Sequence, residues 1–329
     1  LVDTSLLKVC FEYSSYYELN LFLYVKKGYG FKGINKKNLF MRHTRRIRKI
    51  VKVHSPDENS LNSPSRINKG NVNKKNVFLG DYLNKNLLKK IIIKKKIKVI
   101  FHTGAVTQVL LALRDPEYTY NNNINGTLNF LEIIRKINKK IVFIYSSSDK
   151  AYGEVGKKSY TEETCLNSIF PYDVSKSCSD LICQSYAKTY QLKIGILRCG
   201  NLYGPGDFNT GRLINGFIIS KIKNKEFRIR SNGKLVRDYL YIDDAVSAYY
   251  LTMKALLNKK ENLRIYNVGS KFNLNVLEMT KKISKIVDNK KIKIRILNSS
   301  KKEIKSQKLN YQKIIKDLKW KQEINLNQG

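Results

Sequence analysis

Histidine, cysteine and tryptophan are all scarce in this chain of 329 residues, which contains three His, five Cys and one Trp. The cysteines are odd in number, and no two of them have the spacing of a metal-ligand pair. They are Cys10, Cys165, Cys178, Cys183 and Cys199. This pattern excludes a disulfide framework and a zinc or His-rich centre. It predicts reduced thiols in a cytoplasmic protein that holds no metal.

Long apolar segments are missing as well. No run of about 18 apolar residues, the length needed to cross a membrane, occurs in the chain. The first residues have no basic region followed by an apolar core and a small-residue cleavage site, so we expect no secretory signal. At 42% apolar residues, the chain can still fold as one large domain or two smaller ones.

Acidic residues are few, 26 against 63 basic ones, and the net charge is +37. Such a charge is typical of proteins that bind nucleic acids or membrane surfaces. The basic residues are mostly Lys, however, and they are spread over the whole chain instead of forming one stripe with interleaved aromatics. We therefore interpret them as the solvated faces of amphipathic segments, and we expect neither nucleic acid nor a membrane as the partner.

Short apolar runs alternate with helical patterns in the middle of the chain. The runs predict strands at 98–105, 140–148 and 193–204, and the patterns between them predict helices at 125–137 and 177–191. Near-continuous apolar strands separated by helices indicate a parallel sheet that is covered on both faces. The sequence therefore predicts an α/β fold, a doubly wound Rossmann-type parallel sheet.

The pattern changes after about residue 202. Asn232-Gly233 predicts a β-hairpin, helices are expected at 212–224 and 243–256, and the polar stretch 54–76 reads as a loop. These features indicate a smaller mixed α/β part at the C-terminal end, for which substrate binding is implied by the family resemblance described below. The predicted organisation is an atypical extension over 1–20, a Rossmann domain over 21–202 completed by about 235–256, and a substrate-binding part over 203–329 that is truncated at its C-terminus.

Three glycines, Gly28, Gly30 and Gly33, form a G-x-G-x-x-G pattern after an apolar run. In a dinucleotide site such glycines permit a tight turn and let backbone N–H groups approach a pyrophosphate. Taken alone, the pattern fits an ordinary glycine-containing loop equally well.

Tyr172 and Lys176 are four residues apart at the start of a predicted helix, so both side chains point to one side. An ammonium beside a phenol lowers the pKa of the phenol, and such a Tyr can exchange a proton with an alcohol near neutral pH. Ser148, at the end of the strand 140–148, can hydrogen-bond the same oxygen. An exposed Tyr and Lys on a helix is the alternative for this pair alone.

Seven sequence blocks follow one another in a distinctive order: "GD" (80–81), "FHTGA", "NNINGTLNFLE", "SSSDKAYG", "PYDVSK", "RCGNLYGPGD" and "VRDYLYIDDA". Together they resemble the extended short-chain dehydrogenase/reductase family, in its branch of nucleotide-sugar epimerases and dehydratases. The resemblance covers about 76–329 well and 20–55 poorly.

The resemblance implies catalytic roles for five residues. Ser148, Tyr172 and Lys176 match the family's triad, in which Tyr is the base for the sugar 4-hydroxyl and Lys also holds the nicotinamide ribose. Asp149 matches the acid that protonates the departing 6-hydroxyl in 4,6-dehydratases. Lys150 stands where many dehydratases have a Glu base for the C5 proton, and the branch similar to CDP-glucose 4,6-dehydratase has Asp-Lys here.

The binding residues are implied in the same way. Asp81 matches an adenine contact, Ala105 lies in the stretch expected beside the cofactor, and NAD is the expected cofactor with NADP as the alternative. Asn201, Arg212 and Arg237 are expected at the nucleotide or phosphates of the substrate, since guanidinium groups suit phosphate oxygens. The resemblance also implies a homodimer formed through helices at 115–137 and 173–191.

The leading hypothesis is an NAD-dependent nucleotide-sugar 4,6-dehydratase with a CDP-glucose-like substrate. One alternative is a nucleotide-sugar 4-epimerase, which needs the triad but not the acid and base of dehydration. The other is a catalytically impaired binding protein on the same fold. It is suggested by Lys27, which replaces the family's first glycine, and by ends that are expected to reflect a fragment or a frame error.

Overall fold

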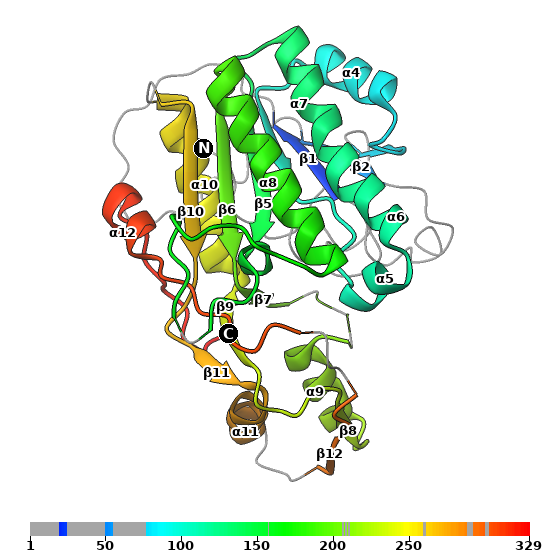
Figure 1. Ribbon diagram of the computed structural model, residues 1–329, viewed down its shortest axis with the longest axis vertical. Coiled ribbons are helices and arrows are strands. Elements are labelled where there is room, and N and C mark those ends of the chain that lie inside the picture. The colour runs from blue at the N-terminus through cyan, green and yellow to red at the C-terminus, as the bar shows by residue number, and fades with distance from the viewer. Residues whose placement is uncertain are drawn as a thin grey trace.

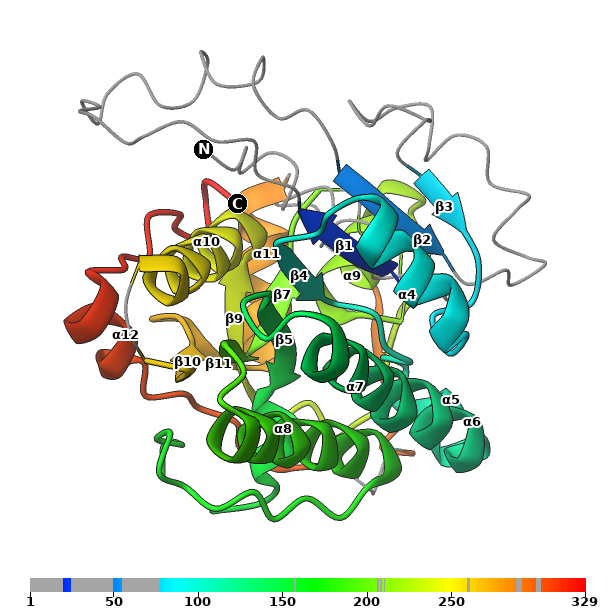
Figure 2. The same ribbon diagram turned by 90° about the horizontal axis from the view of Figure 1, so that it is seen from above.

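The computed structural model describes residues 20–24, 50–54, 77–156, 158–205, 207, 209, 211–258, 261–287, 292–299 and 303–329. Most of these residues form a seven-stranded sheet with helices on both of its faces (Figures 1 and 2). The order of the strands is β10-β6-β5-β4-β1-β2-β3. Their bounds are β1 Asn20–Tyr24, β2 Ile50–His54, β3 Val77–Leu79, β4 Val99–His102, β5 Val142–Ser148, β6 Ile194–Cys199 and β10 Leu263–Val268.

The predicted parallel sheet is confirmed, with β1 as an exception. Strands β10, β6, β5 and β4 pair in parallel, as do β2 and β3. Strand β1 runs antiparallel to both of its neighbours, β2 and β4. Tyr24, the last residue of β1, therefore pairs with Val99 at the amino end of β4, and the chain leaves β1 at the edge opposite the carboxyl ends of the other strands.

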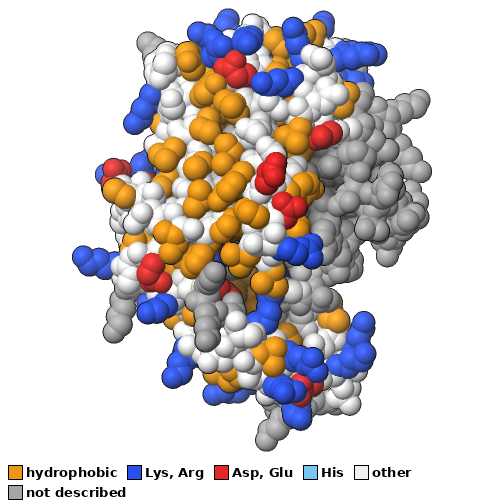
Figure 3. All heavy atoms as spheres, turned by 45° about the vertical axis from the view of Figure 1, so that its right-hand side comes forward, with side chains coloured by type: hydrophobic (Ala, Val, Ile, Leu, Met, Phe, Trp, Pro, Cys, Tyr) orange, Lys and Arg blue, Asp and Glu red, His pale blue; other side chains and the backbone are white. Residues whose placement is uncertain are grey.

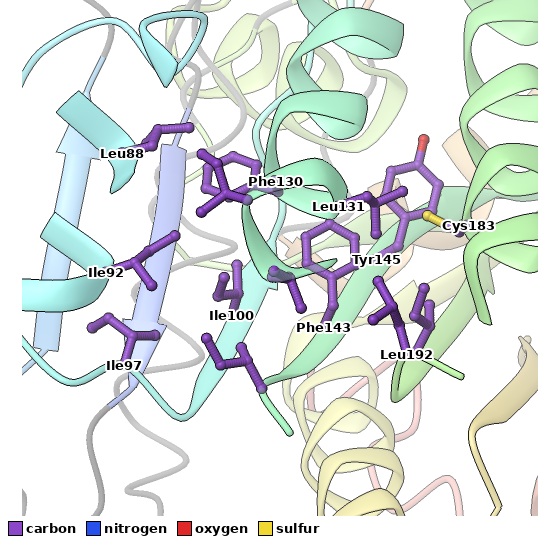
Figure 4. Packing of buried hydrophobic residues seen from close by; sticks show 14 of the residues in the cluster. Leu88, Ile92, Ile97, Ile100, Phe130, Leu131, Phe143, Tyr145, Cys183 and Leu192 are labelled. Carbon is purple, nitrogen blue, oxygen red and sulfur yellow. The ribbon is translucent and has the colours of Figure 1, made fainter. Parts of the chain in front are cut away.

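One face of the sheet is covered by α4 (Lys85–Lys94), α7 (Gly126–Ile137) and α8 (Pro171–Tyr190) (Figure 2). Helix α4 begins where the Asn84 side chain accepts a hydrogen bond from Leu87 N at 3.0 Å, and it buries residues at helical spacing. Phe130 of α7 packs against Phe143 of β5 in the core shared by these helices (Figure 4). Three short helices come between α4 and α7 in the chain. They are α5 (Val109–Arg114), α6 (Pro116–Tyr120) and the π-helix η3 (Asn121–Asn125).

The other face is covered by α10 (Ile242–Asn258) and α12 (Gln312–Leu318). Trp320 follows α12 and is 1% exposed. Its indole Nε1 donates hydrogen bonds to Asp244 O at 3.0 Å and to Ser247 Oγ at 2.9 Å, and its ring meets Tyr311 edge to face. These contacts fix the C-terminal segment against α10 and satisfy the one polar atom of a large buried ring.

The predicted hairpin at Asn232-Gly233 is wrong. Strand β8 (Phe227–Ile229) pairs with β12 (Ile294–Ile296), whereas β9 (Val236–Tyr241) lies between β7 (Asn201–Tyr203) and β11 (Asn273–Asn275). Gly233 has a positive φ of 79°, as a tight turn requires, but the turn carries the chain from one small sheet to another. The two strands are separated because each buries its apolar residues against a more distant segment.

Helices α9 (Leu213–Ile222) and α11 (Val276–Val287) pack beside these small sheets (Figure 1). The helices predicted at 212–224 and 243–256 correspond to α9 and α10. The predicted loop 54–76 and the extension 1–20 lie almost wholly outside the described residues. None of the described helices is both long and apolar enough to cross a membrane.

Candidate active site

The carboxyl end of β5 carries three of the residues singled out from the sequence. Ser148 ends the strand, and its side chain begins the 3-10 helix η4 (Asp149–Tyr152) by accepting a hydrogen bond from Lys150 N at 3.2 Å. The same hydroxyl donates to Asp149 Oδ1 at 3.0 Å. The turn thus brings Ser148, Asp149 and Lys150 together at the edge where doubly wound sheets bind their ligands.

Asp149 is 3% exposed, and among the described residues its Oδ2 atom has no hydrogen-bond partner. Burial raises the pKa of Asp149, while Lys150 and the Ser148 hydroxyl oppose that shift. A carboxyl group whose pKa is raised holds its proton more readily than a free one, which suits a group that protonates a leaving group.

Helix α8 brings Tyr172 and Lys176 to the same strand end. Pro171 is its first residue, which suits the start of a helix because proline has no N–H to leave unpaired. The Lys176 ammonium, 4% exposed, donates to Ser146 O at 2.8 Å and lies 5.2 Å from the centre of the Tyr145 ring. Burial lowers the pKa of Lys176 to about 8.

The expected lowering of the pKa of Tyr172 by Lys176 is wrong for this state of the protein. Burial raises the pKa of Tyr172, and the carboxylates of Asp173 and Asp149 raise it further. Arg212 and the Ser148 hydroxyl act in the opposite direction. Packing, which the residue spacing does not reveal, decides the sign of the shift.

A buried polar network supports this arrangement from below. Arg198 of β6 forms two hydrogen bonds with Asp180 of α8, Nε to Oδ2 and Nη2 to Oδ1, each at 2.9 Å. Ser147 donates to the same Oδ2 atom at 2.7 Å, and Arg198 Nη1 donates to Tyr152 OH at 2.9 Å. The network links α8 to β5 and β6. Asp180 lies one helical turn after Lys176, so this link is close to Ser148 and Tyr172.

The expected cofactor residues are only partly within the described structure. Gly28, Gly30 and Gly33 lie outside it. Asp81 follows β3 and accepts a hydrogen bond from Leu83 N at 2.8 Å, and Ala105, 7% exposed, follows β4. Both therefore lie at the carboxyl ends of parallel strands, where Lys176 also lies.

The described residues fit a dinucleotide at this edge. The Lys176 ammonium has three donors, and one of them donates to Ser146 O. Its remaining N–H groups suit the hydroxyls of a ribose.

Three residues were expected at the substrate, and they lie in different surroundings. Asn201 begins β7, and its Nδ2 atom lies 3.4 Å from Asp238 O. Arg212 precedes α9 and pairs loosely with Asp207 at 3.4 Å. Arg237 is 7% exposed, and its Nη2 donates to Glu303 Oε2 at 3.0 Å. A carboxylate thus already pairs with the guanidinium that was expected to bind phosphate.

The sequence reasoning missed two acids near these residues, Asp173 and Glu303. Asp173 directly follows Tyr172 and is 2% exposed. It is the acid of the motif "PYDVSK", and its place beside Tyr172 is the sequence feature that points to it. Nothing near Glu303 in the sequence points to Arg237, which lies 66 residues away. In the described part of the chain, no group of three or more His, Cys, Asp or Glu side chains is placed to hold a metal ion.

A family model described as GDP-mannose 4,6 dehydratase matches residues 28–329. The dTDP-D-glucose 4,6-dehydratase of Dictyostelium discoideum is 34% identical over 220 residues, which are 64% of this chain and 49% of that relative. The UDP-glucose 4-epimerase of Mycoplasma genitalium is 29% identical, over 63% of this chain and 66% of that protein. The chain therefore spans about half the length of the Dictyostelium relative.

Two solved structures are similar over most of this chain. The UDP-glucose 4-epimerase of Thermotoga maritima, solved with UDP-glucose, has a TM-score of 0.70 at 27% identity and covers 79% of this chain and 85% of its own. The dTDP-glucose 4,6-dehydratase of Bacillus anthracis, solved in complex with NAD, has a TM-score of 0.68 at 27% identity and covers 78% of each chain.

Proposed function

Since this chain belongs to the GDP-mannose 4,6-dehydratase family of extended short-chain dehydrogenases/reductases, we propose that it is an NAD-dependent nucleotide-sugar 4,6-dehydratase. One observation carries the choice of dehydration. Asp149 is a buried carboxyl group with a raised pKa, one of its oxygens has no hydrogen-bond partner among the described residues, and it lies between Ser148 and Lys150 at the strand end. A CDP-glucose-like substrate is favoured by the Asp-Lys pair.

The cofactor proposal rests on the described residues and on the NAD-bound neighbour. Asp81, Ala105 and Lys176 would hold NAD, with Tyr172 beside it, and NADP is the alternative. When bound, NAD supplies the acceptor for a hydride from C4 of the sugar and later the donor of that hydride to C6. We propose that the Rossmann part of the chain holds the cofactor through these residues, and that the part beyond about residue 203 makes the substrate contacts.

The protein's own residues move the protons. Tyr172, as the phenolate, takes the proton of the 4-hydroxyl as the C4 ketone forms. Ser148 and Arg212 favour the phenolate, whereas burial, Asp173 and Asp149 oppose it. The ketone acidifies the C5–H bond, and the Lys150 amine accepts that proton. Asp149 gives its proton to the 6-hydroxyl, which departs as water and leaves a C5–C6 double bond. Lys150 returns its proton to C5 as C6 is reduced, which yields a 4-keto-6-deoxy sugar. The proton that Tyr172 took then balances the one that Asp149 gave to the departing water.

The Asp149→Asn variant tests the dehydration step. We expect it to form the 4-keto-6-deoxy product from CDP-glucose about 10²–10⁴-fold more slowly than the unmodified protein, because the leaving hydroxyl loses its acid. Product would be measured by mass spectrometry as the loss of one water. The matched control is Glu163→Gln, which changes an exposed acid. Equal dehydration rates in Asp149→Asn and the control would contradict the role of Asp149.

A 4-epimerase is the second candidate, because UDP-glucose 4-epimerases are among the similar proteins. Epimerisation needs Ser148, Tyr172 and Lys176 but no acid at C6. An epimerised sugar with no loss of water, formed at the same rate by Asp149→Asn, would establish this candidate and overturn the dehydratase.

We also propose a homodimer as the working form. Hydrophobic side chains gather in a band on the side of the molecule that carries α7 and α8 (Figure 3). Leu181 of α8 is 52% exposed and Leu113 of α5 is 37% exposed. Exposed apolar patches on a folded protein mark surfaces that contact a partner. We expect Leu181→Lys to shift the mass measured by light scattering from two chains to one. A single-chain mass before the substitution would contradict the dimer.

The location proposed for this enzyme is the cytoplasm. Cys165, Cys178, Cys183 and Cys199 are all free thiols in the structure. Unpaired cysteines are typical of reducing compartments.

A further inference from the structure

A recess opens beside the residues proposed for catalysis. It has a volume of about 190 Å³ and is lined by Gly153, Glu154, Ile169, Phe170, Asp173, Glu303 and Ile304. Gly153 follows η4, which begins with the proposed acid, and Asp173 follows Tyr172. Glu303 is the partner of Arg237. The recess therefore lies beside the segments that carry the proposed acid and the tyrosine, and its third side carries the carboxylate that pairs with Arg237.

Three of the lining residues are acids, and they differ in how they are satisfied. Glu154 Oε2 accepts a hydrogen bond from Lys305 N at 2.6 Å, and Glu303 Oε2 accepts one from Arg237 at 3.0 Å. Asp173 is 2% exposed, and its Oδ1 atom accepts no hydrogen bond from the described residues. A buried acceptor without a donor destabilises the protein. A ligand in the recess that donates a hydrogen bond to Asp173 would remove this cost.

The charges around Asp173 favour a cation over a neutral donor. Lys150 and Arg237 lower the pKa of Asp173, whereas Asp149 and Glu303 raise it. Burial is the largest effect and brings the pKa of Asp173 to about 6, so the group is ionised at pH 7. Arg237 is already paired with Glu303, which offsets its charge, and Glu154 adds a further carboxylate to the lining beside Asp173.

We propose that this recess binds a protonated amino substituent on the hexose of the substrate, with Asp173 as its acceptor. The proposal rests on the proposed function, since it assumes a nucleotide sugar at the same site. A charged N–H donor to a carboxylate forms a stronger hydrogen bond than a sugar hydroxyl does. Ile169, Phe170 and Ile304 supply apolar walls for the carbons that carry the amino group. Among nucleotide sugars of the proposed kind, those that carry an amino group on the hexose are therefore expected to bind more tightly than glucose itself.

The test compares ligands that differ by one group. UDP-glucose, UDP-glucosamine and its 3-amino isomer, together with the same three sugars on CDP, are titrated by calorimetry at pH 7 without turnover. At least one amino sugar should bind about tenfold or more tightly than its hydroxyl counterpart on the same nucleotide, the size of one charge-assisted hydrogen bond. Asp173→Asn should abolish that preference while still binding the glucose form. Glu163→Gln, an exposed acid outside the recess, should keep it.

Repeating the titrations at several pH values shows whether the preference for amino sugars depends on the charge of Asp173 or on the shape of the recess. The preference should fade as the pH falls below about 6, because Asp173 becomes protonated and loses its charge. Thermal unfolding of Asp173→Asn shows whether the variant is folded, and a folded variant that keeps the preference overturns the proposal. Equal binding of amino and hydroxyl sugars, or binding of neither, also overturns it. Product assays are not used in this test, so a failed dehydration with an intact amine preference would count against the reaction alone.

Discussion

Tyr172→Phe is expected to lower turnover of the nucleotide sugar by about 10²–10⁴-fold, the usual contribution of one positioned acid–base group. The substitution removes only the hydroxyl that exchanges a proton with the sugar. The ring keeps its buried place at the start of α8, 9% exposed. The loss should therefore fall on kcat, with KM little changed, because substrate binding does not depend on the proton transfer. Steady-state rates and a calorimetric Kd measure the two effects separately.

The matched control for this variant is Tyr250→Phe. Tyr250 is a half-buried tyrosine of α10, on the opposite face of the sheet, and packs against the core there. It should keep full activity. If Tyr172→Phe were as active as this control, Tyr172 would not be the proton acceptor, and the Ser148-Tyr172-Lys176 assignment would fail with it.

Asp180→Asn is expected to lower the free energy of unfolding by about 3–5 kcal/mol, because it leaves the charge of Arg198 buried and uncompensated. Arg198 is 2% exposed and Asp180 is fully buried. Asparagine has nearly the same size, so the loss reports charge and hydrogen bonding instead of a cavity. Urea denaturation followed by circular dichroism gives the change directly.

An exposed ion pair provides the comparison for Asp180→Asn. Glu226 pairs with Arg228 at 3.1 Å, and the Arg228 side chain is 65% exposed. Glu226→Gln should cost far less than Asp180→Asn, since solvent screens such pairs. A loss of that small size in Asp180→Asn as well would mean that the buried pair does not hold α8 against the sheet.

Local patterns predicted the sheet and its helices well. The runs ending in "FIYSSS" and "ILRC" became β5 and β6 because a strand buried on both faces must be apolar almost throughout. Pairing between distant segments could not be predicted. Strand β8 pairs with β12, which lies more than sixty residues later in the chain. Strand β1 runs antiparallel to β4, and the direction of a strand relative to its neighbours leaves no periodic pattern in a single sequence.

The candidate site shows the same division. The order of the motifs predicted that Ser148, Asp149, Tyr172 and Lys176 lie close together, and the structure brings them to one strand end. The surroundings were not predictable, because they come from segments that are far apart in the chain. Burial changes the sign of the pKa shift of Tyr172, and Glu303 approaches Arg237 across 66 residues.

Trp320 gives this protein a built-in optical probe of one region. It is the only tryptophan in the chain, and it is held between α10 and Tyr311 with its indole N–H bonded on α10. Its emission should shift to longer wavelength when the segment after α12 detaches, before or with loss of the sheet. A change of emission on adding a nucleotide sugar would therefore report a change in the surroundings of this ring, where the C-terminal segment meets α10.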